Sequence, residues 1–429
     1  MKIRITSALF FLIGYTLLAQ HSIIPTPVNY ISQKGSFVFT PKTKVYLKSS
    51  NSELRQIIDL HFSSFFGAGL VVASEKPENN SNYVSLEINK NPEASIGKEG
   101  YTLDVNEKTI ELKANTITGL FYALQTFDQL FLVEKLNKEG VSIPACKIKD
   151  YPRFVWRGLM LDVSRHFYTT NELKEYIDWM SKYKFNVLHW HLTDDNGWRI
   201  EIKALPKLTQ MGAWRVERFG LFGEREAPNQ AEKTTYGGFY TQDEIKDIVK
   251  YAEKKQITIV PEIDVPGHSM ALLAAYPELS TLKEPKMVNP GSKFSEWHGD
   301  GTFTMTVENS LNPSDEKVYS TLEAIFGEVA ALFPGQYIHL GGDECYHGYW
   351  EKDENCKSLM KRENLKDAKE LQSYFIKRVV KIITSKGKKV IGWDEILDGG
   401  LAEGAAVMSW RGTEGGIKAA KLGHQVVMS

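Results

Sequence analysis

The sequence places two carboxylates side by side, Asp343 and Glu344, directly after a short apolar segment and the glycines Gly341 and Gly342. The apolar residues suit a buried strand, and the glycines let other groups approach its end closely. Two acids there can divide the work of catalysis, because one can stay ionised while the other is held protonated as a general acid. The alternative is an aspartate that caps the next helix beside a surface glutamate. Polar ends on three further predicted strands favour the catalytic interpretation.

Two of these polar ends follow the predicted strands 158–163 and 257–263. Arg165 comes after the first strand, and its fork of donors can hold neighbouring hydroxyl groups. The alternative for Arg165 is an ion pair between loops. Asp264 and His268 come after the second strand, and a carboxylate and an imidazole that converge there can tune the pKa of a neighbouring acid.

The predicted strand 186–192 carries His189 and His191, which share one face because alternate residues of a strand point the same way. This spacing also suits a metal site of an amidohydrolase-like barrel. A metal site would need more histidine ligands on later strands and an aspartate from an eighth strand. His268 and His339 are present, but no such aspartate is available, so we predict a site without metal.

Two tryptophans, Trp393 and Trp410, end the predicted strands 388–393 and 405–410. Each alone could be structural. Both stand beside charged residues at a barrel mouth, where an exposed indole is costly unless something flat packs on it. The C–H faces of sugars stack well on indole, so the pair favours a pyranose pocket.

The elements that position these residues begin near Arg157, where strands and long helices start to alternate. Seven strands are expected, at 158–163, 186–192, 257–263, 336–341, 388–393, 405–410 and 424–428. Thr169 with Glu172 and Thr241 with Glu244 have the spacing of helix capping boxes, and a long amphipathic helix is expected at 366–386. The fold class is therefore α/β, a (β/α)8 TIM barrel whose eighth strand is apparently missing. Residues 203–238 form a long irregular insertion.

The preceding residues, 21–150, predict a small α/β domain without a catalytic constellation. Strands are expected at 37–39, 45–47, 84–88, 101–105 and 110–112, the last two as a hairpin, and a helix at about 117–130. We expect this domain to support the catalytic domain at 151–429.

The first 20 residues resemble a secretory signal, with a basic start and a mainly apolar run from Ser7 to Leu18. We therefore expect an exported protein, periplasmic or secreted, without a transmembrane anchor. A net charge of −1 and the absence of a basic block argue against a nucleic-acid partner. The three cysteines leave open whether Cys345 and Cys356 pair.

Taken together, six ordered motifs resemble glycoside hydrolase family 20, the β-N-acetylhexosaminidases. In this sequence they are Trp156-Arg157-Gly158 with Leu161-Asp162 and Arg165-His166; His189, His191-Leu192, Asp194-Asp195 and Gly197-Trp198-Arg199; Pro261-Glu262-Ile263-Asp264 with Pro266-Gly267-His268; His339 with Gly341-Gly342-Asp343-Glu344; Gly392-Trp393-Asp394-Glu395; and Met408-Ser409-Trp410. The resemblance runs from about residue 25 to the end.

The resemblance implies an exo-acting enzyme that removes terminal β-linked N-acetylglucosamine or N-acetylgalactosamine from glycans by a retaining, substrate-assisted mechanism. Glu344 would be the general acid and base, and Asp343 would orient the substrate's 2-acetamido group and stabilise an oxazolinium intermediate. The implied substrate-binding residues are Arg165, Asp194, His268, Trp393 and Trp410, with Asp264 and His191 in support. No metal or organic cofactor is implied.

The sequence ends at Ser429, inside the last predicted strand, whereas family members continue with further pocket residues and an eighth strand. Whether the chain that ends at Ser429 is active by itself, or is a poorly stable or inactive fragment, stays open at this point. Two other readings stay open: a disaccharide-releasing activity within the family, and a carbohydrate-binding fragment without turnover.

Overall fold

The computed structural model describes residues 22–63, 70, 72–73, 75–77, 82–131, 140–300 and 302–429. The predicted signal segment lies outside these residues. The chain divides into two compact units, residues 1–153 and 154–429. No helix among the described residues is long and apolar enough to cross a membrane.

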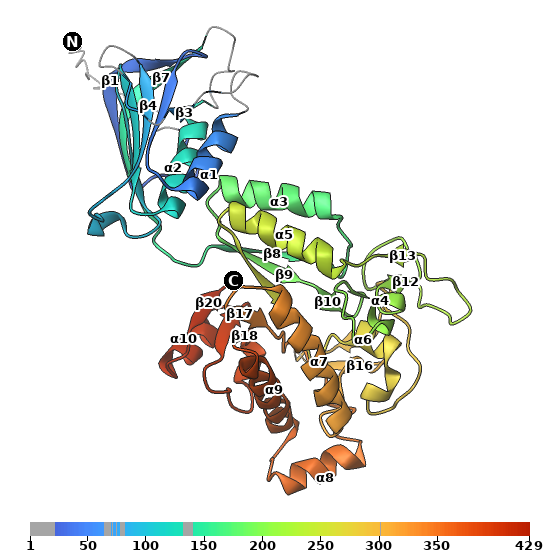
Figure 1. Cartoon of the computed structure of the whole chain (residues 1–429). Coiled ribbons are helices and arrows are strands. Elements are labelled where there is room, and N and C mark those ends of the chain that lie inside the picture. Colours follow the sequence, from blue (N-terminus) through green and yellow to red (C-terminus); the bar gives the residue numbers. More distant parts are fainter. Residues whose placement is uncertain are drawn as a thin grey trace, which may run out of the picture. The chain divides into compact units, whose positions relative to one another are not determined.

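The N-terminal unit is a mixed sheet with helices against it. Its strand order is β1-β7-β5-β6-β4-β2-β3. The strands are β1 (Asn29–Phe39), β2 (Lys44–Lys48), β3 (Val72–Ala73), β4 (Tyr83–Ile88), β5 (Tyr101–Val105), β6 (Thr109–Ala114) and β7 (Val141–Asp150). Apolar residues of α1 (Ser52–Phe62) and α2 (Ile117–Gln129) share one buried core with the strands (Figure 1). The predicted hairpin is confirmed as the antiparallel pair β5 and β6.

The C-terminal unit is built on a curled parallel sheet, which confirms the predicted barrel class. In the described part of the chain the sheet has seven strands in the order β20-β19-β18-β17-β14-β9-β8. They are β8 (Gly158–Asp162), β9 (Val187–His191), β14 (Thr258–Glu262), β17 (Tyr337–His339), β18 (Lys389–Trp393), β19 (Ala406–Ser409) and β20 (Val426–Met428). Since all seven are parallel, their carboxyl ends share one edge of the sheet.

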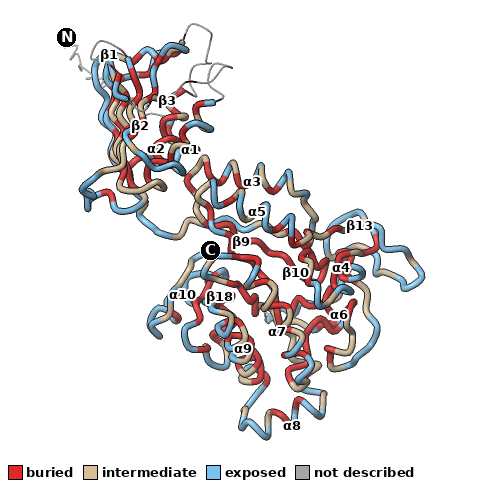
Figure 2. Tube along the Cα trace, viewed as in Figure 1, coloured by how far each residue is buried: buried red, intermediate tan, exposed pale blue. Residues whose placement is uncertain are grey.

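Helices pack against the outside of this sheet. They are α3 (Thr170–Lys182), α5 (Gln242–Lys254), α7 (Glu316–Leu332), α9 (Ala368–Ser385) and α10 (Thr413–Lys421). Two further helices, α6 (Met270–Ala275) and α8 (Glu354–Arg362), lie in the segments that follow β14 and β17. Both predicted capping boxes are present, at the starts of α3 and α5. Buried residues of α3, α5, α7 and α9 form one core with the strands, and Figure 2 shows β9 and β18 as largely buried. The outer strands β8 and β20 are exposed or half-buried.

Loops at the carboxyl ends of the strands carry short elements of their own. They are β10 (Thr193–Asp194), β11 (Gly197–Trp198), α4 (Lys207–Gln210), β12 (Trp214–Arg215), β13 (Tyr236–Gly237), β15 (Ser295–Trp297), β16 (Phe303–Met305) and the 3-10 turns at Pro277–Leu279 and Asp394–Leu397. The N-terminal unit has one more such turn, at Ala94–Ile96. The insertion predicted as irregular thus contains α4 and the β12–β13 pair. All three cysteines are free, which answers the open question of a pair between Cys345 and Cys356.

Candidate active site

Asp343 and Glu344 lie in the loop after β17, beside a cavity of about 870 Å³ that both side chains line. Gly341 has a φ of +75°, and a Cβ atom there would overlap the carboxylate of Asp264. Gly342 has a φ of +97°, and a Cβ atom there would press on Ile396. The glycine pair is therefore required for close approach at the strand end, as the sequence predicts.

The backbone is strained at two residues of this site. Six non-glycine residues in the described part of the chain have a positive φ, and three of them directly follow helix ends, at Lys184, Gln256 and Asn364. Glu344 (φ +43°) and His268 (φ +49°) lie instead in the loops after β17 and β14. Left-handed backbone at a non-glycine residue costs of order 1–3 kcal/mol and is typical of functional sites.

His268 joins the carboxylate pair to a second acidic pair. Its Nε2 lies 3.5 Å from Asp343 Oδ2 and 3.4 Å from Glu344 Oε2. Its Nδ1 lies 3.1 Å from Asp194 Oδ1 and 3.2 Å from Asp195 Oδ2. Burial lowers the pKa of His268, but the negative charges of Asp194 and Asp343 outweigh burial and raise it well above the usual value. His268 is therefore a buried cation between four carboxyl groups.

Arg165 holds the other side of Asp194. Its Nη1 lies 2.5 Å from Asp194 Oδ2 and donates to Asp162 Oδ2 at 3.0 Å. Burial opposes the ionised form of Asp194, but the charges of Arg165 and His268 lower its pKa far below the usual range. The structure thus places Arg165 in ion pairs with Asp194 and Asp162 and also at the wall of the cavity, and its binding of substrate hydroxyls stays a prediction.

Asp264 is buried beneath the carboxylate pair. Its Oδ1 accepts from the backbone N–H of Gly342 at 3.1 Å, and its Oδ2 has no hydrogen-bond partner among the described residues. Burial and the charge of Asp343 raise the pKa of Asp264 well above the usual value. A neutral Asp264 can offer a proton toward the cavity floor, which an ionised carboxylate cannot do.

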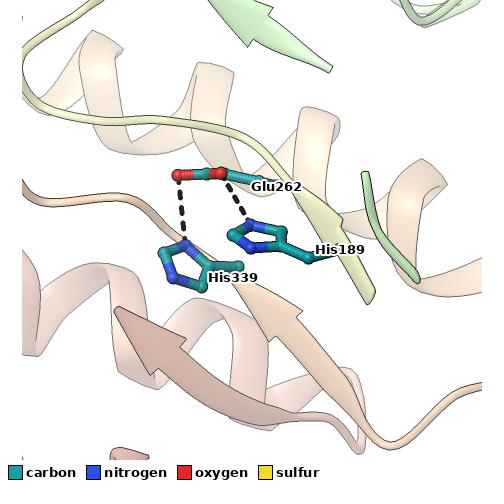
Figure 3. A group of neighbouring side chains, drawn as sticks. All are labelled: His189, Glu262 and His339. Atoms are coloured by element: carbon teal, nitrogen blue, oxygen red, sulfur yellow. Dashed lines mark ion pairs between the residues drawn. The ribbon is translucent and has the colours of Figure 1, made fainter. Parts of the chain in front are cut away.

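Glu262 is a fully buried carboxylate that contacts three histidines, His189, His191 and His339. This group is called the floor below. Glu262 Oε2 lies 2.5 Å from His191 Nδ1 and 2.7 Å from His189 Nε2. Its Oε1 accepts from Trp393 Nε1 at 2.9 Å and lies 3.2 Å from His339 Nδ1. Figure 3 shows the rings of His189 and His339 turned toward this one carboxylate, with ring centroids 4.5 Å apart.

This floor extends to the carboxylate pair through His191, whose Nε2 lies 2.8 Å from Asp194 Oδ2. Burial lowers the pKa of His191, but the charge of Glu262 and hydrogen bonds to both acids raise it well above the usual value. Burial opposes the ionised form of Glu262, yet His191 and His339 lower its pKa well below the usual range. Negative and positive groups therefore alternate from Glu262 through His191 and Asp194 to His268.

Three groups in this region bring potential metal ligands within 4.8 Å of one another, and one of them is His189, Glu262 and His339. Two of its ligand atoms already accept hydrogen bonds. The N–H of Gly341 donates to His339 Nδ1 at 3.0 Å, and the indole of Trp393 donates to Glu262 Oε1. The one lone pair of His339 Nδ1 is therefore engaged by the Gly341 N–H, and this argues against a metal bound through that atom.

The two predicted tryptophans both line the cavity. Trp393 is nearly buried, and its indole is fixed by Glu262. Trp410 is more exposed and donates from Nε1 to Glu395 Oε2 at 3.0 Å. Burial raises the pKa of Glu395 to about 8. Each indole therefore has its N–H held by a carboxyl group, which sets the orientation of the ring face.

The carboxylate pair itself is electrostatically unequal. Burial raises the pKa of Asp343, whereas the hydrogen bond from His268 lowers the pKa of Glu344. The free site therefore favours the proton on Asp343. A general acid at Glu344 requires the opposite distribution, and a ligand amide N–H donated to Asp343 would stabilise its anion and shift the proton balance.

All nine predicted site residues come together in the C-terminal unit. Asp343, Glu344, His268, Arg165, Trp393 and Trp410 line the cavity, and Asp194, Asp264 and His191 lie behind them. Sequence reasoning did not single out Glu262 or Glu395 as site residues. The signal for Glu262 was a glutamate inside an apolar strand pattern, Ile259 to Ile263, because such a residue is buried and needs partners.

The parallel sheet with an acidic pocket at its carboxyl edge has the architecture of the (β/α)8-barrel class, in which functional sites lie at that edge. Residues 154–429 match the catalytic domain of glycosyl hydrolase family 20, and residues 20–151 match domain 2 of the same family. The chain belongs to glycosyl hydrolase family 20.

Similar curated proteins are longer than this chain. A β-hexosaminidase of Porphyromonas gingivalis is 38% identical over 417 residues, which are 95% of this chain and 50% of that protein. A β-hexosaminidase of Vibrio furnissii is 34% identical over 95% of this chain and 62% of its own length. The chain thus spans about half to three-fifths of these relatives.

Solved structures agree with this assignment. An exo-β-N-acetylglucosaminidase from Vibrio harveyi, in complex with N-acetylglucosamine, is 31% identical with a TM-score of 0.78, over 95% of this chain and 60% of that one. A chitobiase from Flavobacterium johnsoniae is 34% identical with a TM-score of 0.74, over 95% of this chain and 58% of that one.

Proposed function

We propose that this chain is an exo-acting β-N-acetylhexosaminidase that removes terminal β-linked N-acetylglucosamine or N-acetylgalactosamine from glycans. The main support is the adjacent pair Asp343 and Glu344, whose carboxylates both lie near His268 Nε2. Both acids line a cavity that is also lined by two tryptophans. The names of the relatives from Porphyromonas gingivalis and Vibrio harveyi support the same activity.

The proposed mechanism uses the substrate as its own nucleophile. Glu344 donates a proton to the glycosidic oxygen while the acetamido carbonyl oxygen attacks the anomeric carbon, so the bond to the leaving group breaks as a cyclic oxazolinium forms. Asp343 accepts the acetamido N–H and stabilises the positive charge of this intermediate. Glu344 then removes a proton from water as the water opens the ring, which retains the β configuration. Two adjacent acids suit this scheme because neither must face the other across the sugar.

The first test is release of 4-nitrophenol from its N-acetyl-β-glucosaminide by the purified chain and its Asp343→Asn and Glu344→Gln variants. We expect each variant to lose about 10²-fold or more in kcat, because one removes charge stabilisation and the other the proton donor. Matched thermal melts establish that the variants fold. A folded wild-type chain without activity would contradict the hydrolase proposal and favour a carbohydrate-binding fragment.

The substrate-assisted step has its own test. Replacing the acetamido group by mono-, di- and trifluoroacetamido groups should slow turnover progressively, because fluorine withdraws electron density from the attacking carbonyl oxygen. Rates that do not respond to fluorination would point to an enzyme nucleophile instead. The same series on the galactose epimer compares the two proposed terminal sugars.

We also propose that the protein is exported, on the basis of the basic and apolar residues at 1–20. Cell fractionation of the full-length protein and of a version without these residues tests this. Export of both versions, or of neither, would contradict it.

A further inference from the structure

A row of aromatic rings leads from an exposed hairpin to the loop that carries Glu344. The strands β15 and β16 pair antiparallel, with Trp297 opposite Phe303. The ring centroids of these two residues are 4.9 Å apart, at an interplanar angle of 35°. Phe303 in turn lies 5.9 Å from the ring of Tyr346, which follows Glu344 by two residues.

The hairpin is tied to that loop at its base. The ring of Tyr346 packs edge-on against Tyr349 at 5.6 Å, and the hydroxyl of Tyr349 donates to the backbone carbonyl of Met305 at 3.1 Å. Met305 is the last residue of β16 and is buried. Movement of the hairpin away from the loop would break this hydrogen bond and the aromatic contacts, so the position of Trp297 is coupled to that of the acid loop.

Trp297 is 60% exposed, and the contact with Phe303 covers one side of its indole. A large ring fixed by aromatic neighbours while most of its surface meets water is suited to binding a flat partner with an apolar face. The C–H face of a pyranose has this character.

We propose that Trp297, supported by Phe303, is a stacking platform for the sugar on the leaving-group side of the bond that is cleaved. This proposal rests on the proposed function. In the proposed mechanism the terminal sugar occupies the cavity lined by Trp393 and Trp410, and Glu344, which lines the same cavity, protonates the leaving-group oxygen. The aromatic row starts at Tyr346, two residues after Glu344, and leads to Trp297, so we assign it to the next sugar of the chain. The platform would therefore favour oligosaccharides over simple aryl glycosides.

The test compares Trp297→Ala with Trp179→Ala as a matched control. Trp179 is likewise exposed, at 51%, but it lies on α3 and stacks on Tyr183. For Trp297→Ala we expect KM for chitotriose to rise about tenfold, while kcat/KM for the 4-nitrophenyl glycoside stays within about twofold of wild type. The control should change neither. Equal effects of Trp297→Ala on both substrates, or no effect on chitotriose, would overturn the platform.

A binding measurement separates this proposal from the proposed function. Calorimetric titration of the Glu344→Gln chain with chitotriose should give an affinity that falls about tenfold when Trp297→Ala is added and is unchanged by Trp179→Ala. If the wild-type chain hydrolyses nothing but this difference is seen, the platform stands and the hydrolase proposal fails. If aryl glycosides are hydrolysed but Trp297→Ala leaves chitotriose binding unchanged, the platform proposal is wrong and the hydrolase proposal stands.

Discussion

At the scale of single residues, His268 controls the proton balance of the site. Its positive charge lowers the pKa of Glu344 and works against the effect of burial on Asp343. In the proposed mechanism the free enzyme needs Asp343 ionised and Glu344 protonated. The active form of the pair carries one proton, so the two acids together set the acid and alkaline limbs of the pH dependence of kcat/KM.

We therefore expect His268→Gln to move both limbs of that profile to higher pH, because both acids lose a neighbouring cation and both pKa values rise. We also expect kcat to fall about tenfold or more, since the acid loses its hydrogen-bonding partner. Rates of 4-nitrophenol release across the pH range measure both effects. His424→Gln is a suitable control, because the ring of His424 pairs with the backbone carbonyl of Ala405 at 2.8 Å. A lower kcat with unmoved limbs would show a merely structural role for His268.

At the scale of elements, the strand end after β17 depends on Gly341. Gly341 and Gly404 share a φ of +75°, but an added Cβ atom meets Asp264 at the first position and nothing within 4 Å at the second. Gly404→Ala should therefore cost about 1–3 kcal/mol from backbone strain alone. Gly341→Ala should cost about 1–3 kcal/mol more from overpacking, and it should also displace Asp264 and lower activity. Urea unfolding of both variants gives the difference, and equal losses would contradict this account.

Regular elements of the catalytic unit could be predicted because each has a local signal. The seven strand patterns and the capping residues Thr169 and Thr241 are of this kind, and the structure confirms them. The role of Glu262 could not be predicted, since its partners come from three other strands and meet only in the folded sheet. The strained backbone of Glu344 also has no sequence signal, because tertiary contacts impose it.

At the scale of the whole molecule, the chain has separate hydrophobic cores in its two units. Phe37 is fully buried in the N-terminal core, and Phe326 is fully buried in the core of the catalytic unit. Each Phe→Ala substitution should cost about 3–5 kcal/mol in its own unit. In scanning calorimetry we expect Phe37→Ala to lower one unfolding transition and Phe326→Ala to lower a different one. If both variants shift a single common transition equally, the units do not unfold independently.

The left-handed backbone of Glu344 has a consequence for how such a chain can change over generations. Glycine and asparagine adopt this conformation at lower cost than glutamate, so the fold by itself would favour replacing the acid. Selection for turnover therefore favours glutamate at this position, whereas selection for stability favours glycine or asparagine. Under selection for heat resistance alone, we expect substitutions of Glu344 that raise stability and abolish catalysis.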